Sequence, residues 1–292
     1  MKPVSTGSDT VGAAIVTPTD EILAEKKQAE NFPVALRILP SALRRDLGAV
    51  YDVARAIDDI GDESEGDRTA ALLRFREDLS RAWEGKPTTP VLRRLVPAIH
   101  ARELEREPFD RLVRANLQDQ KVTRYATQAE LAQYCTLSAD PVGRIVLRIF
   151  GVRSPEAERL SDLVCTALQL IEHCQDVAED KRAGRIYLPR EDLDGFGVTE
   201  SDLDAGTANA AVRRAVAAQA GKALDQLTAG APLVGLLQGW ARLAIAGYLA
   251  GGLATVDALR RADWDVLSVT PRPRKRDVLI HLVKLLVRGG RR

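Results

Sequence analysis

Three acidic side chains recur one helical turn apart near the middle of the chain. On a helix, Glu172, Asp176 and Asp180, with Gln169 one turn earlier, fall within a sector of about 80°. An apolar stripe lies about 120° away on the same helix. Like charges one turn apart repel each other, so either solvent or a bound cation must compensate for them. This stretch alone leaves both interpretations open.

A second stretch repeats the arrangement more than a hundred residues earlier. Asp58 and Asp62 share a helical face with Tyr51 and Arg55, and Asp59 lies at its edge. If the two stretches face each other across a cavity, their four or five carboxylates could not all stay ionised without a counter-charge. Mg²⁺ removes this conflict, because it binds a few carboxylates and completes its shell with phosphate oxygens.

Basic side chains near both stretches favour a diphosphate ligand, with arginine giving bidentate contacts. Beside Arg55 these are Lys181, Arg182 and Arg185. Paired carboxylates also serve as general acid and base in glycosidases, but doublets on two helices suit metal bridging better. A di-iron bundle would require Glu-x-x-His, whereas Glu172 is followed directly by His173.

Composition bounds the protein class. The 292 residues are 45% hydrophobic, enough for a large core, and the net charge of +1 gives no argument for a nucleic-acid partner. Three cysteines without a CxxC pair indicate reduced thiols and a cytoplasmic protein. The N-terminus lacks the pattern of a signal peptide, and no apolar run approaches the ~20 residues of a membrane span.

The elements that must position these residues are expected to be helices, because β-branched runs are scarce. We predict one all-α domain over residues 20–288, a disordered segment over 1–19 and a basic tail over 289–292. The helix over 127–150 should bend near Pro141, and 195–201 should form a loop. The predicted helices cover residues 20–30, 40–63, 67–83, 91–104, 108–119, 127–150, 154–181, 207–228, 232–260 and 273–288.

Two motifs resemble those of the squalene/phytoene synthase family. The first is the Asp-Asp-Ile-Gly-Asp run at residues 58–62. The second covers residues 169–180 and is followed by Gly-Arg-Ile-Tyr-Leu-Pro at 184–189. The resemblance extends over about residues 28–285, and the stretches at 30–35, 119–125 and 134–143 are most similar to the family's hydroxysqualene-forming branch.

This resemblance implies a class I isoprenoid (terpenoid) synthase fold, a single helical domain around a central cavity. It implies two or three Mg²⁺ ions held by the two motifs, and presqualene diphosphate as substrate. Water would give hydroxysqualene and diphosphate without NADPH, in squalene and hopanoid biosynthesis. The alternatives are head-to-head condensation of two prenyl diphosphates to squalene or phytoene, and a non-catalytic binding protein of the same fold. A chain-elongating prenyltransferase fits less well, because the second motif is not a second Asp-Asp-x-x-Asp.

The resemblance also assigns residues. The metal ligands it implies are Asp58, Asp59, Asp62, Glu172, Asp176 and Asp180. The catalytic residues it implies are Arg55, Asp58, Asp62, Glu172, Asp176 and Asp180. The substrate-binding residues are Phe32, Tyr51, Arg55, Tyr134, Ala139, Val142, Gln169, Lys181, Arg185, Tyr187 and Tyr248, with core packing as the alternative for the aromatic ones. Glu172 stands where the family commonly has Asn, so it is either a third acidic ligand or a group that places the quenching water.

The C-terminal residues 273–292 combine basic side chains with apolar ones. Such a helix either packs on the domain with a solvated basic face or lies on an anionic membrane. The second alternative would make the protein peripheral at the inner membrane face.

Overall fold

The structure is a computed structural model that describes residues 39–288. These residues form helices and no strand, which confirms the all-α class. The predicted helix over 20–30, the segment 1–19, the tail 289–292 and the pocket residue Phe32 lie outside the described residues. The helices are α3 (Ser41–Asp62), α4 (Arg68–Ala82), α5 (Pro90–Arg102), α6 (Arg106–Asp119), α7 (Gln128–Ser138), α8 (Asp140–Ile149), α9 (Pro155–Gln175), α10 (Val177–Arg182), α11 (Arg190–Phe196), the 3₁₀ helix η1 (Glu200–Asp204), α12 (Ala210–Gly230), α13 (Leu233–Leu236), α14 (Gly239–Arg261) and α15 (Lys275–Arg288).

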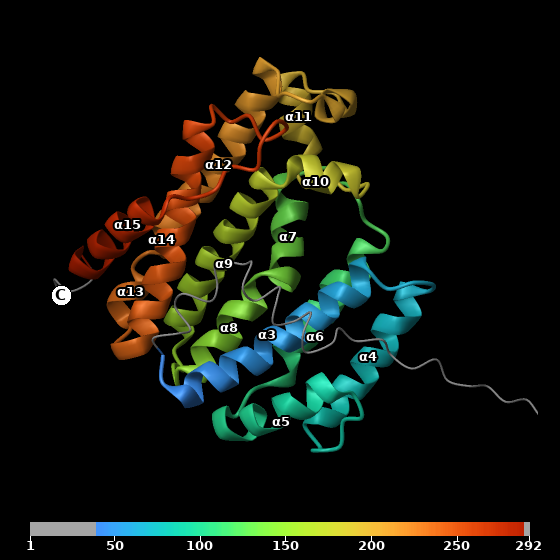
Figure 1. The fold of residues 1–292 in the computed structure, drawn as a ribbon, viewed down its shortest axis with the longest axis vertical. Helices are drawn as coiled ribbons and strands as arrows, with labels where there is room; N and C mark the ends of the chain where they lie inside the picture. Colours follow the sequence, from blue (N-terminus) through green and yellow to red (C-terminus); the bar gives the residue numbers. More distant parts are fainter. Residues whose placement is uncertain (1–38, 289–292) are drawn as a thin grey trace, which may run out of the picture.

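Two long helices organise the bundle, and each carries one acidic stretch. Helix α3 packs against α4, α5, α6 and α8, whereas α9 packs against α7, α8, α12 and α14. Figure 1 shows α9 running through the middle of the molecule with α3 across its lower half. The space between α3 and α9, floored by α6 and α7, is where the two acidic stretches meet.

Side-chain caps set where several helices begin. Asp67 accepts a hydrogen bond from the amide of Ala70, and Ser154 accepts one from that of Ala157, so both side chains act as N-caps at the predicted starts of these helices. Thr127 accepts a hydrogen bond from Glu130. These caps satisfy amide groups that have no partner inside the helix.

The helix predicted over 127–150 is two helices, and the prediction of one bent helix was wrong. Helix α7 ends at Ser138 and α8 begins at Asp140, with Ala139 (φ −108°, ψ −53°) between them. Pro141 explains the break, because a proline has no amide hydrogen and clashes with the carbonyl one turn earlier. Pro141 instead lies in the first turn of α8, where its missing amide hydrogen costs no hydrogen bond.

The helix predicted over 154–181 also divides, at Asp176 (φ −102°, ψ 15°). The break is local, because the Asp176 amide still donates to the carbonyl of Glu172 at 3.0 Å and the Asp176 carbonyl accepts from the Asp180 amide at 2.8 Å. The acidic face therefore continues from α9 into α10.

The helix predicted over 232–260 divides into α13 and α14. Leu237 and Gln238 are extended, and Gly239 has a φ of +55°. Glycine adopts this left-handed conformation readily, so the chain turns sharply here. The short helices α11 and η1 were not predicted, and part of the expected loop at 195–201 belongs to them.

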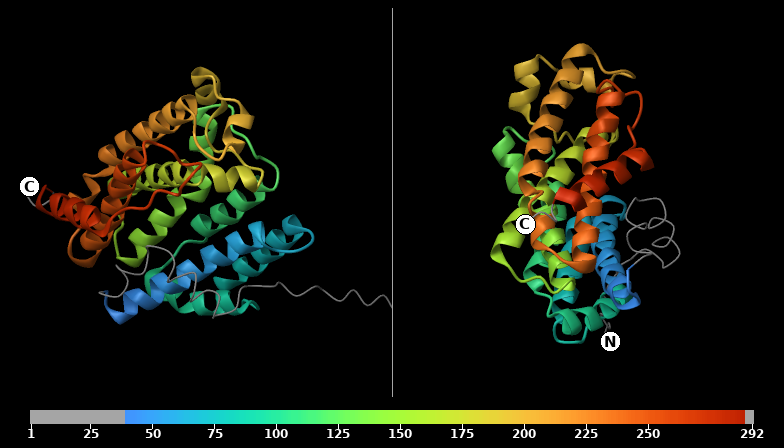
Figure 2. Two further views of the ribbon diagram at one scale, coloured as in Figure 1. Left: turned by 45° about the horizontal axis from the view of Figure 1, so that its top comes forward. Right: turned by 90° about the vertical axis from the view of Figure 1, so that its left-hand side faces the viewer.

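Helix α14 is long and apolar enough to cross a membrane by length and composition, but 61% of its most apolar window is buried inside the protein. It packs against α9, α12, α13 and α15. We therefore interpret α14 as a core helix of the bundle, which Figure 2 shows from two further sides.

Candidate active site

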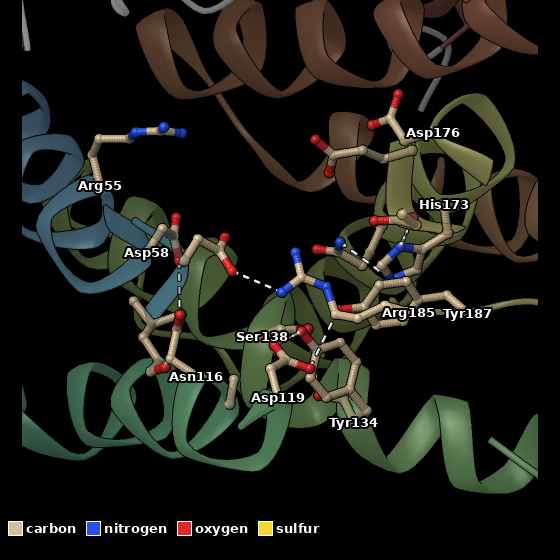
Figure 3. Close-up of a pocket in the computed structure, with 16 residues that line it drawn as sticks. Arg55, Asp58, Asn116, Asp119, Tyr134, Ser138, His173, Asp176, Arg185 and Tyr187 are labelled. Atoms are coloured by element: carbon tan, nitrogen blue, oxygen red, sulfur yellow. Dashed lines mark hydrogen bonds and ion pairs between the residues drawn. The ribbon is translucent and has the colours of Figure 1, made fainter. Parts of the chain in front are cut away.

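A polar cavity of about 280 Å³ lies between the two acidic helices. Asp58 and Asp62 of α3 line one wall, and Asp176 and Asp180 line the opposite wall. Figure 3 shows the two groups of side chains on opposite sides of the cavity. The structure thus brings together the two stretches that the sequence separates by more than a hundred residues.

Arg185 projects between the two walls. Its Nη1 atom donates to Asp62 Oδ1 at 2.8 Å, and its side chain is 21% exposed. Backbone pairing fixes its segment, because the Ile186 amide donates to the Thr123 carbonyl at 2.9 Å and the Arg190 amide to the Tyr125 carbonyl at 2.9 Å. A guanidinium held in this place can bind an anionic ligand in the cavity.

Asp58 is held by a side chain that sequence reasoning missed. Asn116 of α6 donates from Nδ2 to Asp58 Oδ1 at 3.0 Å. A Cβ atom at Gly61 would lie 2.2 Å from Asn116 Oδ1, so only glycine lets α6 approach α3 this closely. Asp58 reaches the open part of the cavity, yet the surrounding walls remove hydration and raise its pKa to about 6.

The carboxylate of Asp119 forms the floor of the cavity. It accepts hydrogen bonds from the hydroxyls of Tyr134 at 2.6 Å and Tyr187 at 3.2 Å. Burial raises its pKa to about 6 despite these donors, and the nearby Arg185 opposes that shift. In the sequence, Asp119 belongs to the stretch 119–125 that resembles the family, but the resemblance assigned no role to this residue.

His173, to which the sequence assigned no role in the site, lies in the same cluster. Its ring stacks on Tyr187 with a centroid distance of 3.8 Å, and its Nδ1 atom is 3.9 Å from Asp180 Oδ2. Burial lowers the pKa of His173, and the charge of Asp180 opposes this only in part. The side chain of Gln169 lies beside this ring, with its Nε2 atom 3.4 Å from His173 Nε2.

Of the predicted site residues Arg55 and Asp59, only Arg55 lines the cavity, and the two side chains form an ion pair. Arg55 lines the cavity, and its Nε atom is 2.8 Å from Oδ1 of Asp59. Asp59 is buried and is not among the lining residues. The pairing holds the guanidinium in place and leaves Asp59 behind it.

Three further predicted residues do not line the polar cavity. Lys181 points to η1, where its Nζ atom is 3.1 Å from Asp204 Oδ1. Ala139 is buried at the junction of α7 and α8. Tyr51 lies on α3, half-buried, outside the lining.

An apolar cavity of about 440 Å³ adjoins the polar one. Val142 of α8 and Tyr248 of α14, both predicted to bind substrate, line it together with Ile245 and Leu168. Within the part of the chain that the structure describes, Glu172 is the one residue that lines both cavities. A ligand with a charged head and a hydrocarbon body fits this pair of cavities.

The acidic side chains fit a metal that is shared with a ligand. Among residues 39–288, no three His, Cys, Asp or Glu side chains lie close enough to hold an ion by themselves. Mg²⁺ in proteins commonly takes only one or two carboxylates and completes its shell with water and phosphate. Desolvation, together with the charge of Asp180, raises the pKa of Asp176 to about 6, and a nearby cation would relieve this cost.

Comparisons with known proteins agree with this geometry. Residues 25–278 match the squalene/phytoene synthase family. The hydroxysqualene synthase of Zymomonas mobilis is 35% identical over 193 residues, which are 65% of this chain and 64% of that protein. The presqualene diphosphate synthase of Sinorhizobium fredii is 33% identical over 66% of this chain and 70% of that protein. The alignment thus spans just under two thirds of the first relative's length.

Two solved structures are similar over nearly the whole chain. A squalene synthase HpnC from Alicyclobacillus acidocaldarius has a TM-score of 0.77 and 41% identity, covering 84% of this chain and 94% of that one. A dehydrosqualene synthase has a TM-score of 0.82, covering 92% and 96%, and its 22% identity makes it a likeness of fold alone. The predicted isoprenoid synthase fold around a central cavity is confirmed.

Proposed function

Since the chain belongs to the squalene/phytoene synthase family, we propose that it converts presqualene diphosphate and water into hydroxysqualene and diphosphate. The observation that carries this proposal is the pair of adjoining cavities, one acidic and one apolar, with Glu172 in the lining of both. The polar cavity suits the diphosphate, and the apolar cavity suits the hydrocarbon. The similarity to a hydroxysqualene synthase supports the choice within the family.

The residues of the polar cavity bind and orient the diphosphate. Arg55 supplies a guanidinium group on the α3 wall, and Arg185 supplies one between the two walls. Mg²⁺ held by Asp58, Asp62, Asp176 and Asp180 would neutralise the charge of the leaving diphosphate. The floor, with Asp119 hydrogen-bonded to two tyrosines, keeps its shape when ligand enters because both hydroxyls have partners.

In this proposal, Glu172 holds the water molecule that adds to the carbocation. When the carbon–diphosphate bond breaks, the rearranged cation must bond to the oxygen of one water, which then loses a proton. A carboxylate at the border of both cavities accepts a hydrogen bond from such a water and can take this proton. The apolar lining excludes other water from the cation. No step of this reaction uses a reductant, so NADPH is not required.

Product analysis tests the proposal. The purified protein is incubated with Mg²⁺ and either presqualene diphosphate or farnesyl diphosphate, in water enriched in ¹⁸O, and the products are identified by mass spectrometry. We expect labelled hydroxysqualene from presqualene diphosphate. Product from farnesyl diphosphate alone, with presqualene diphosphate inert, would instead indicate a head-to-head condensing enzyme.

Substitutions separate catalysis from mere binding. Asp58→Ala and Asp176→Ala should each lower turnover by about 10³-fold or more, because each removes an interaction with the leaving group. Asp225→Ala, an exposed acid of α12 outside both cavities, is the matched control and should keep full turnover. A non-catalytic binding protein would show no turnover even before substitution.

Glu172→Gln tests the role of this side chain in hydration. We expect diphosphate release to continue while the fraction of alcohol among the products falls by about 10²-fold or more, as dehydrated alkenes replace it. An unchanged alcohol fraction would show that Glu172 does not place the water.

A further inference from the structure

Helix α15 is apolar on two faces, and only one of them is covered. Leu282, Leu285 and Leu286 pack against the core. On the outer side Leu279, Ile280, Val283 and Val287 are 60%, 49%, 52% and 57% exposed. The sequence suggested either a helix packed on the domain or a helix lying on a membrane. In the structure, one apolar face of α15 packs on the domain and a second apolar face is exposed.

The charges around the exposed apolar face are positive. The exposed basic residues over 274–288 are Arg274, Lys275, Arg276, Lys284 and Arg288. The one acidic residue of α15 is Asp277, which is 13% exposed and pairs with Arg261 at 2.6 Å and Arg276 at 3.2 Å. Lys284 and Arg288 each follow an exposed valine by one position, so they flank the apolar stripe.

The corner between α13 and α14 adds to the same side of the molecule. Leu236 is 44% exposed and Trp240 is 41% exposed. Helix α13 contacts α15, and the Nη2 atom of Arg242 donates to the carbonyl of Leu286 at 2.6 Å. Figure 1 shows α13 and α15 together along one outer edge of the molecule. Tryptophan is enriched where proteins meet the headgroup level of a membrane.

We propose that this surface, formed by the outer face of α15 with Leu236 and Trp240, docks the protein on an anionic lipid bilayer. An exposed apolar stripe flanked by basic side chains matches a bilayer chemically, because its valines and isoleucine enter the acyl boundary while Lys284 and Arg288 meet anionic headgroups. Helices α13 and α14 also line the apolar cavity, through Leu233, Ile245 and Tyr248. Leu236 and Trp240 of the docked face therefore belong to the same two helices that would hold a hydrocarbon chain.

Vesicle sedimentation with the full-length protein tests this surface. One set of vesicles is pure phosphatidylcholine, and the other holds equal parts of phosphatidylcholine and phosphatidylglycerol. We expect the protein to bind the anionic vesicles at least about tenfold more tightly. Raising the ionic strength to about 1 M should remove most of this preference, because the Debye length falls to about 3 Å.

Two double variants examine the apolar and the basic component separately. Ile280→Ser with Val283→Ser should lower the affinity for the anionic vesicles by about tenfold or more. Lys284→Glu with Arg288→Glu should do the same on anionic vesicles and leave binding to neutral ones unchanged. The matched controls are Leu73→Ser, an exposed leucine of α4, and Arg214→Glu, an exposed arginine of α12.

The outcomes decide the proposal. Because the substituted side chains are exposed and lie outside both cavities, the variants should keep their melting temperature and their turnover of detergent-dispersed substrate. Absence of vesicle binding by the unsubstituted protein, or equal binding by the variants and controls, overturns the proposal. A lipid-independent dimer that Ile280→Ser with Val283→Ser converts to monomer would show that a second copy covers this face instead.

Discussion

At the scale of residues, the arginines of the site are held in ion pairs, whereas two of its aspartates are desolvated. Arg55 and Arg185 each contact an aspartate of α3, whereas Asp58 and Asp176 have pKa values raised to about 6 by lost hydration. The cavity thus presents anchored cations beside carboxylates that gain from a further positive charge. This combination suits a ligand that carries both phosphate oxygens and metal ions.

Arg185→Met should weaken binding of diphosphate in the presence of Mg²⁺ by about tenfold or more, because a charge-assisted hydrogen bond is lost. The diphosphate affinity of Arg185→Lys should lie between those of the unsubstituted protein and Arg185→Met, since lysine keeps the charge but lacks the planar guanidinium. Isothermal titration calorimetry with inorganic diphosphate measures both. Arg190→Met, which removes a 78% exposed arginine nearby, is the control. Equal affinities for all four proteins would show that Arg185 does not contact the ligand.

Asp140 offers a test of electrostatics away from the site. It is 6% exposed, it accepts a hydrogen bond from Thr166 at 2.8 Å, and burial raises its pKa to about 7. The folded state therefore binds this proton more tightly than the unfolded state, so its ionisation lowers stability as the pH rises between the two pKa values. Asp140→Asn removes the charge and keeps an acceptor for Thr166.

We expect the melting temperature of the Asp140→Asn variant to exceed that of the unsubstituted protein at about pH 8, and the difference to shrink toward about pH 5. Thermal unfolding followed by circular dichroism at both pH values measures this. The idea fails if the difference does not change with pH.

At the scale of elements, the interruptions of helices have distinct causes and consequences. Pro141 ends α7 and begins α8, whereas the break at Asp176 keeps the acidic face in one cavity. On α14, Gly247 and Gly251 face the apolar cavity one turn apart, and a Cβ atom at either would contact nothing within 4 Å. Because these two glycines have no side chain, they leave room for a ligand in the apolar cavity.

Gly251→Leu should fill part of this space. We expect affinity for farnesyl thiodiphosphate to fall by about tenfold or more, because several methylene groups lose their burial. Affinity for geranyl thiodiphosphate and for inorganic diphosphate should change little. Gly221→Leu, the same change at an exposed glycine of α12 with open space around it, is the control. If farnesyl affinity is retained in Gly251→Leu, the hydrocarbon binds elsewhere.

At the scale of the whole molecule, the polar cavity joins two groups of helices. Helix α3 with α4 and α5 forms one side, and α9 with α12 and α14 forms the other. The ion pair of Arg185 with Asp62 and the hydrogen bond of Tyr187 with Asp119 join elements that are distant in sequence. A ligand that neutralises both acidic walls should therefore stabilise the bundle as a unit.

Mg²⁺ and diphosphate together should raise the melting temperature by about 5 °C at saturation, and either one alone by much less. Asp58→Ala and Asp176→Ala should each abolish the shift, although they lie on opposite walls, whereas Asp225→Ala should retain it. Differential scanning fluorimetry measures the shift. A full shift in either cavity variant would mean that one wall binds the ligand alone.

Local patterns in the sequence determined the helical class, the starts of the helices near Asp67 and Ser154, and the two acidic faces, because these features depend on spacing within one element. The metal-ligand and substrate roles assigned to individual residues remain predictions. The sequence predicted only a bend near Pro141, whereas the structure has a break at Ala139, since periodicity does not show whether a proline bends a helix or begins a new one.

Only the tertiary structure decided which side chains meet. Asn116 lies outside both motifs, and His173 lies within the second one without an assigned role. Their place in the cavity depends on how α6 approaches α3 at Gly61 and how α9 packs on Tyr187. The same packing turned Lys181 toward Asp204 and placed Glu172 between the two cavities. Helical periodicity specifies the face on which a side chain lies, but contacts between distant segments fix what that face meets.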